Sequence, residues 1–280
     1  MEQLAKISGR LLEGPVWDSQ KQVLYFVDIE DKKIYRYVPK SEIVKKLDLH
    51  SYVGCLVLET TGKLIAAMAD GLYRIDFEQH MYQKVMDSPF NQGIRFNDGK
   101  CDRYGNLWVG TMAIDQSLNA KEAGSLYCIR NNLIIEAYTG YTIPNGLSWN
   151  QEGTRFYHID TPTKKVDEYE VEEETVIKNR STRIDLSNEQ GSPDGMCQDE
   201  DGNFWIAMWG GSKVICCHGM TGKVLEEILV PDKNVSCCTF GGENLDTLYI
   251  TTAKDNEGNG GRVYTQTMKV RGREVYRYGK

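Results

Sequence analysis

The 280 residues of the chain are enough to bury a sizeable core, and a composition of 40% hydrophobic and 26% charged residues excludes a disordered or fibrous protein. Lys and Arg total 33 against 40 Asp and Glu, and this net charge of −7 argues against a nucleic-acid partner. No uncharged apolar run approaches the roughly 20 residues that cross a bilayer, and the N-terminus lacks the apolar segment of a signal peptide, so we expect a cytoplasmic protein with no membrane partner.

A polar turn followed by a short alternating strand recurs six times along the chain. The copies lie at residues 19–26, 61–66, 104–109, 152–157, 201–206 and 244–249. Each predicts a tight turn that enters a strand. A second short strand follows each copy, and these strands begin at Ile34, Leu72, Leu126, Val166, Val214 and Val263.

This periodicity predicts an all-β fold. No segment carries a sustained helical stripe of apolar residues with capping residues at its ends. One sixth of the chain is about 47 residues, which is the length of a four-stranded propeller blade. We therefore expect residues 1–280 to form a single domain, a six-bladed β-propeller. Strand-like pieces at residues 5–11 and 274–278 would close its ring by pairing the first segment with the last.

Polar residues at the starts of the first strands of the blades are the candidate functional residues, because these strands line the central channel of a propeller. Four of the six predicted first strands place a carboxylate or an amide directly before glycine, namely Glu13, Asp98, Asn145 and Asp194. Asp-Gly and Asn-Gly are also common turn dipeptides, but in each repeat the turn lies later in the sequence. Oxygen ligands without His or Cys suit Ca²⁺, Mg²⁺ or Mn²⁺, and Zn²⁺ would be accepted without being selected. We predict a divalent metal site in the central channel.

Other residue types carry less information about function. Arg95 precedes Asp98 and either holds a polar substrate or pairs with a neighbouring carboxylate. The four histidines show no metal-binding spacing, and the chain has no Gly-x-Ser-x-Gly motif. The eight cysteines include no Cys-x-x-Cys pair, so we expect buried free thiols.

Six short motifs follow one another along the chain. They are Leu12-Glu13-Gly14-Pro15-Val16-Trp17, Arg95-Phe96-Asn97-Asp98-Gly99-Lys100, Gly110-Thr111-Met112, Pro144-Asn145-Gly146-Leu147, Pro193-Asp194-Gly195-Met196-Cys197, and Ser236-Cys237-Cys238 before Phe240-Gly241-Gly242. Together they resemble the SMP-30/gluconolactonase/regucalcin family, in order, from about Glu13 to Ala253. The resemblance implies a six-bladed propeller with one divalent metal ion in its channel.

The resemblance also implies roles for single residues. Glu13, Asn145 and Asp194 would bind the metal directly, Arg95 and Asn97 would contact a sugar-derived substrate, and Asp194 would also be the general base. Asp98 then becomes a neighbour of the metal, although its register places it with the ligands.

One loop departs from the family. Many members carry a glutamate shortly after Gly-Thr-Met that reaches the substrate, whereas this chain has Ala113-Ile114-Asp115-Gln116. Asp115 is the candidate for that role with a shorter reach. The loop at residues 115–123 is therefore where we expect substrate choice to differ.

Together with the metal site predicted from the residues, the resemblance implies metal-assisted hydrolysis of a small sugar-type lactone to its hydroxy acid. The metal would polarise the lactone carbonyl and Asp194 would activate a water molecule, with a hydroxide bound to the metal as the competing base. Two other functions use the same ligands: a non-enzymatic, regucalcin-like propeller that binds a divalent cation, and a hydrolase of another ester or a phosphotriester. The oligomeric state is left open.

Overall fold

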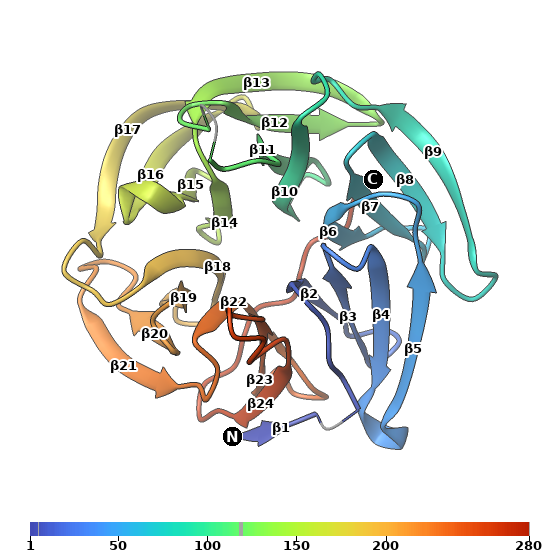
Figure 1. Ribbon diagram of the computed structural model, residues 1–280. Helices are drawn as coiled ribbons and strands as arrows, with labels where there is room; N and C mark the ends of the chain where they lie inside the picture. Colours follow the sequence, from blue (N-terminus) through green and yellow to red (C-terminus); the bar gives the residue numbers. More distant parts are fainter. Residues whose placement is uncertain (5, 118–119, 280) are drawn as a thin grey trace.

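The computed structural model describes residues 1–4, 6–117 and 120–279, and Figure 1 shows how their 24 strands are arranged. No α-helix occurs among these residues. Two short 3₁₀ helices, η1 (Pro39–Ser41) and η2 (Thr161–Thr163), connect strands. The all-β fold predicted from the repeats is confirmed. No helix in the described part of the chain is long and apolar enough to cross a membrane.

Four sheets contain four antiparallel strands each, paired in chain order. Their strands are β2 (Leu12–Asp18), β3 (Val23–Asp28), β4 (Lys33–Val38) and β5 (Ile43–Asp48); β6 (Val53–Leu58), β7 (Leu64–Met68), β8 (Gly71–Asp76) and β9 (Met81–Asp87); β10 (Ile94–Cys101), β11 (Leu107–Ala113), β12 (Gly124–Arg130) and β13 (Leu133–Tyr141); β14 (Pro144–Trp149), β15 (Arg155–Asp160), β16 (Lys165–Glu172) and β17 (Val176–Asp185).

A fifth sheet has eight strands in two halves. One half contains β18 (Ser192–Gln198), β19 (Phe204–Trp209), β20 (Lys213–Cys217) and β21 (Val224–Leu229), and the other contains β22 (Asn234–Gly241), β23 (Thr247–Ala253), β24 (Val263–Thr267) and β1 (Glu2–Gln3). A single residue pair, Trp209 with Asn234, joins the halves. All six predicted turn-and-strand copies are confirmed, because they correspond to β3, β7, β11, β15, β19 and β23.

The first strands of these groups surround the centre of the molecule (Figure 1). β2 contacts β6, β6 contacts β10, and the series continues through β14, β18 and β22, which contacts β2 again. The ring of first strands is therefore closed. Six hydrophobic clusters fill the spaces between neighbouring groups of strands. All eight cysteines are buried and free, as predicted.

The two chain ends have different roles in closing the structure. β1 pairs with β24, with Glu2 opposite Thr265 and Gln3 opposite Tyr264. The expected pairing of the first segment with the last is therefore made by Glu2–Gln3 and β24, rather than by residues 5–11 and 274–278; Ala5 lies outside the described residues. Glu2 and Gln3 carry no apolar alternation that would indicate a strand.

The C-terminal strap, defined here as residues 271–279, crosses the central region and links several sheets (Figure 1). Backbone hydrogen bonds join it to Glu200, Leu245, Leu58, Thr60 and Gly105. These partners lie at or just after the ends of first strands, so the strap lies at the end of the ring opposite the starts of the first strands.

Buried aspartates build the turns at the same end of the ring. Asp102 accepts hydrogen bonds from the backbone and side-chain nitrogens of Asn106 at 3.0 and 2.7 Å, and from Trp108 Nε1 at 2.9 Å. Asp199 makes the same bonds with the residues four and six positions later. The repeated spacing thus fixes the turn that leads from a first strand into a second strand.

Candidate metal and substrate site

Every first strand contains a β-bulge near its start. The pairing register shifts after Glu13, Val53, Phe96, Asn145, Pro193 and Val235, respectively. Bulges re-aim side chains and are common next to functional sites. The four candidates chosen from the sequence, Glu13, Asp98, Asn145 and Asp194, all lie at these bulges.

The glycines at the bulges allow the first strands to approach one another closely. A Cβ atom at Gly195 would lie 2.2 Å from Cys237 Sγ, and one at Gly54 would lie 2.2 Å from the Phe96 carbonyl oxygen. Because neither position has room for a side chain, glycine is required there for packing around the channel.

Three carboxylates are buried together at this end of the channel. Glu13, Asp98 and Asp194 are 7%, 8% and 6% exposed. Burial, and then the negative charge of Asp98, raise the pKa of Glu13 to about 8. Burial, followed by the charge of Glu13, raises the pKa of Asp194 well above its ordinary value. Burial also raises the pKa of Asp98. These groups therefore destabilise one another when they are ionised.

The three carboxylates have few partners. The Gly14 N–H donates to Glu13 Oε2 at 2.7 Å, and the Gly99 N–H donates to Asp98 Oδ1 at 2.8 Å. The Asp194 carboxylate accepts no hydrogen bond from any described residue. Buried acids are normally hydrogen-bonded or paired, so the oxygen atoms without a partner here are free to accept a cation or a polar ligand.

A chain of hydrogen bonds connects the substrate candidates to the metal candidates. Arg95 Nη1 donates to Asn97 Oδ1 at 2.8 Å, and Asn97 Nδ2 donates to Asn145 Oδ1 at 2.9 Å. Asn145 Nδ2 donates to Thr161 Oγ1 at 2.8 Å, and this hydroxyl donates to the Pro193 carbonyl at 2.9 Å. A carbonyl oxygen has two lone pairs, so Asn145 Oδ1 keeps one for another ligand.

Sequence reasoning missed Thr161. The residue lies in η2, outside every motif, and a threonine in a polar turn gives no signal of its own. Its contacts fix the side-chain amide of Asn145 and join it to the strand that carries Asp194.

Arg95 belongs to the hydrogen-bond chain rather than to an ion pair. Its guanidinium donates to Asn97 and to the Phe96 carbonyl oxygen, and within the described residues it makes no salt bridge. Burial lowers the pKa of Arg95 to about 10, so the group remains protonated at neutral pH. Its other N–H groups are available to a polar ligand.

Asp115 lies in an exposed turn. Its Oδ1 accepts hydrogen bonds from the backbone nitrogen and the hydroxyl of Ser117, at 2.9 and 2.5 Å. Residues 118–119 of the predicted specificity loop lie outside the described residues. The contact of Asp115 with substrate therefore stays a prediction.

The donor set of the channel fits a hard divalent cation. No group of three or more His, Cys, Asp or Glu side chains in the described part of the chain is arranged to hold a metal ion. The predicted set of Glu13, Asn145 and Asp194 does not depend on such a group, because it combines two carboxylates with one amide oxygen. Two buried acids with raised pKa values and an amide oxygen with a free lone pair match the ligand preferences of Ca²⁺ or Mg²⁺.

The family model of the SMP-30/gluconolactonase/LRE-like region matches residues 11–254. The chain belongs to this family. A relative is YvrE of Bacillus subtilis (strain 168), whose proposed activity is that of a sugar lactone lactonase. It is 34% identical over 246 residues, which cover 87% of this chain and 83% of YvrE.

Two solved structures share the fold over the whole chain. A luciferin-regenerating enzyme has a TM-score of 0.92 and 28% identity, with 100% of this chain and 99% of that chain covered. A regucalcin from Agrobacterium tumefaciens, named as a calcium-binding protein, has a TM-score of 0.92 and 24% identity, with 100% and 97% covered.

Proposed function

We propose that residues 1–280 form one six-bladed β-propeller that binds a divalent metal ion in its central channel and hydrolyses a small sugar lactone to the hydroxy acid. The closed ring of six first strands supports six blades, once the two halves of the eight-stranded sheet are counted separately. Family membership and the lactonase activity proposed for YvrE support the substrate class.

One observation carries this proposal. Three buried carboxylates lie near enough to raise one another's pKa at the bulged ends of the first strands, and Arg95 and Lys100 offset their charge only in part. Glu13, Asn145 and Asp194 would hold the ion, which can be Ca²⁺, Zn²⁺, Mg²⁺ or Mn²⁺, and the name of the Agrobacterium regucalcin makes Ca²⁺ the first choice. When bound, a divalent cation withdraws electrons from a lactone carbonyl and stabilises the negative charge that develops on its oxygen.

The residues around the ligands supply binding and proton transfer. Arg95 and Asn97 are fixed to each other and hold the ring hydroxyls of the sugar, which orients the carbonyl carbon for attack. Asp194 has a carboxylate without a hydrogen bond from the described residues, so it takes a proton from the attacking water. The water oxygen bonds to the carbonyl carbon, the bond from this carbon to the ring oxygen breaks, and the ring oxygen takes up the proton.

The test is proton release from several aldonolactones by metal-stripped protein that is resupplied with each of the four ions in turn. We expect turnover that requires a metal and disappears with EDTA. A panel of simple esters and phosphotriesters, run in parallel, separates lactone hydrolysis from a broader esterase activity.

The second candidate is a cation-binding protein without catalytic activity, which the calcium-binding neighbour favours. Tight Ca²⁺ binding with no turnover of any lactone, ester or phosphotriester would replace the lactonase proposal with this one. A binding protein has no use for Arg95 and Asn97 beside the ligands, and their bond to each other therefore favours the enzyme.

A further inference from the structure

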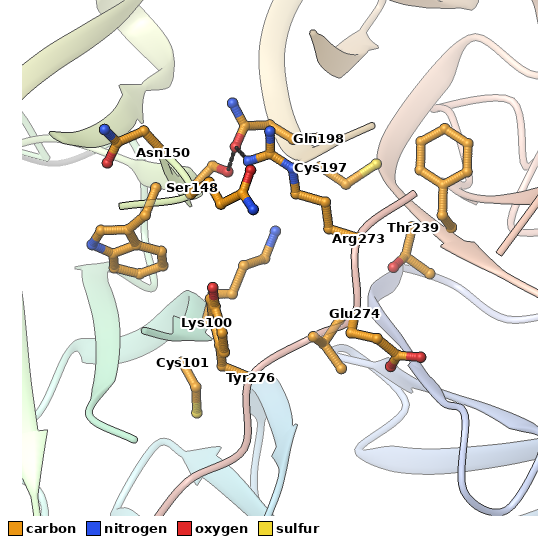
Figure 2. Close-up of a pocket in the computed structure, with 14 residues that line it drawn as sticks. Lys100, Cys101, Ser148, Asn150, Cys197, Gln198, Thr239, Arg273, Glu274 and Tyr276 are labelled. Carbon is orange, nitrogen blue, oxygen red and sulfur yellow. Dashed lines mark hydrogen bonds between the residues drawn. The ribbon is translucent and has the colours of Figure 1, made fainter. Parts of the chain in front are cut away.

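Lys100 ends the Arg-Phe-Asn-Asp-Gly-Lys motif and has no role in the proposed reaction. It lies on β10, two residues after Asp98, and its side chain enters the lower channel, the cavity between the bulges and the C-terminal strap. This cavity has a volume of about 90 Å³, and its lining includes Lys100, Ser148, Gln198, Thr239 and Tyr276. Figure 2 shows the Lys100 ammonium directed into its centre.

The ammonium of Lys100 joins two strands that are not neighbours in the ring. Its Nζ donates to the Met196 carbonyl oxygen at 2.7 Å, so it connects β10 with β18. β14 lies between these strands, because β10 contacts β14 and β14 contacts β18. Met196 follows Asp194 by two residues. The bond therefore ties the strand of Arg95 and Asn97 to the strand of Asp194.

The other charged groups that line the cavity belong to the strap, and each has a partner other than Lys100. Arg273 Nη1 donates to Gln198 Oε1 at 3.3 Å, and Glu274 Oε2 accepts a hydrogen bond from Ser19 Oγ at 2.8 Å. Lys100 itself makes no salt bridge with any described carboxylate, and its ammonium donates to the Met196 carbonyl oxygen. An apolar residue at position 100 would leave that carbonyl without its donor.

We propose that Lys100 is a positioning residue that holds β18 at the distance from β10 at which Asp194 faces Asn97 and Arg95. The role in binding and turnover rests on the proposed function, whereas the tie between the strands does not. Burial raises the pKa of Asp98, and the nearby Lys100 charge offsets part of this rise.

Calcium affinity distinguishes this role from a simple effect of charge. Removing a positive charge beside a cation site strengthens cation binding, because it removes a repulsion. Removing a tie that positions a ligand weakens cation binding, since the ligand must be reordered on binding. The two accounts therefore predict changes of opposite sign.

The experiment compares Lys100→Met, which keeps the apolar stem, with Lys100→Arg, which keeps a donor. Thr239→Val is the matched control, because it changes a neighbouring side chain of the same cavity at constant shape. Titration calorimetry of the full-length, metal-stripped protein with Ca²⁺ measures the affinity. We expect a Kd raised at least ~10-fold in Lys100→Met, within ~3-fold of wild type in Lys100→Arg, and unchanged in Thr239→Val. An unchanged or lower Kd in Lys100→Met overturns the proposal.

Turnover at saturating Ca²⁺ gives a second readout. We expect Lys100→Met to lower kcat while the KM for the lactone stays within ~3-fold, because Arg95 and Asn97 remain on β10. If Lys100→Met fails to fold, Lys100→Leu, which also lacks a donor, replaces it with the same expected results. A KM that rises as much as kcat falls would contradict a role through Asp194.

Hydrogen exchange tests the tie without depending on activity. We expect faster exchange in residues 192–198 of the metal-free Lys100→Met protein, with residues 144–149 unchanged. Equal exchange rates in residues 192–198 of wild type and variant overturn the tie. If wild-type protein neither binds Ca²⁺ nor hydrolyses a lactone, the proposed function fails, and the exchange result alone decides whether Lys100 positions β18.

Discussion

The two ends of the channel contain buried acids with opposite surroundings. At the strap end, Asp102 and Asp199 accept hydrogen bonds from turn nitrogens and from a tryptophan, and Asp18 pairs with Arg277 at 2.7 Å. At the bulge end, Glu13 accepts one hydrogen bond and Asp194 accepts none from the described residues. The acids at the strap end are built into the fold, whereas those at the bulge end keep oxygen atoms without a partner among the described residues.

This difference separates structural acids from functional ones more sharply than burial does. Asp102 is 2% exposed and Asp194 is 6% exposed, so both are buried. The number of hydrogen-bond partners distinguishes them, because Asp102 accepts bonds from Asn106 and Trp108 whereas Asp194 accepts none from the described residues. The proposed function therefore uses acids that are buried beside one another and lower the stability of the metal-free fold when they ionise.

The largest expected effect comes from removing an acid at the bulge end. Asp194→Ala should weaken Ca²⁺ binding by at least ~100-fold and reduce lactone turnover to below ~1% of wild type, since the residue is both ligand and base in the proposal. Titration calorimetry and proton release measure the two quantities. Full activity in this variant would eliminate the proposed mechanism.

Arg95→Met is the control for that variant. The guanidinium holds Asn97 and contacts substrate in the proposal but does not bind the metal. We expect its KM to rise ~10-fold or more while Ca²⁺ affinity stays equal or becomes tighter. If Arg95→Met loses Ca²⁺ binding, the expected separation fails, and Arg95 and Asp194 are both needed to hold the metal site together.

The metal-free protein should lose stability as the pH rises, because of the acids at the bulge end. The pKa of Glu13 is raised from 4.5 to about 8, and that of Asp194 is raised in the same direction. Between these values the folded state holds protons that the unfolded chain has released, so the free energy of unfolding falls with increasing pH. One pKa unit corresponds to about 1.4 kcal/mol, which predicts a loss of a few kcal/mol.

Thermal unfolding at pH 5.5 and pH 8.5 with EDTA measures this loss. Saturating Ca²⁺ should remove most of it, and Glu13→Gln, which cannot ionise, should have a smaller pH dependence than wild type. If the Tm of the metal-free protein rises between pH 5.5 and pH 8.5, the acids at the bulge end ionise without lowering the free energy of unfolding.

Much of the fold was predictable because its signals are local. The turns and alternating residues of 104–109 and 201–206 predicted β11 and β19 correctly. A turn and the alternation of a strand can both be recognised within a few consecutive residues. Closure by Glu2–Gln3 was not predictable, because two exposed polar residues become a strand only through their partner, β24.

The candidate site likewise contains residues that the sequence predicted and residues that it did not. Polar-glycine pairs at corresponding repeat positions predicted that Glu13, Asp98, Asn145 and Asp194 lie at the starts of the first strands, where the structure has bulges. The resemblance to the family implied their roles. Thr161 was not predicted, because its hydroxyl links Asn145 on β14 to Pro193 on β18, and no local sequence pattern indicates such a link. The role proposed for Lys100 depends likewise on an acceptor 96 positions away in the chain.

A smaller effect, on stability alone, is expected from breaking an ion pair at the strap end. Arg277→Met removes the partner of the Asp18 side chain, which is 1% exposed. We expect a loss of about 2–3 kcal/mol in the free energy of unfolding measured in urea, because a buried carboxylate loses its cation. Ca²⁺ affinity and kcat should stay within ~2-fold of wild type. A large change in Ca²⁺ affinity would mean that the two ends are coupled.

The smallest effect is expected at Asp115. The residue was predicted to reach substrate, but its carboxylate is exposed and its bonds go to Ser117 in its own turn. If this turn persists when substrate binds, Asp115→Ala should change kcat/KM for an aldonolactone by less than ~3-fold, because the lost bonds order only an exposed loop. Steady-state kinetics of Asp115→Ala and Arg95→Met, measured side by side, allow the two changes in KM to be compared. A rise in KM of ~10-fold or more, with Ca²⁺ affinity unchanged, would show that the loop rearranges and that Asp115 contacts the sugar, as the sequence predicts.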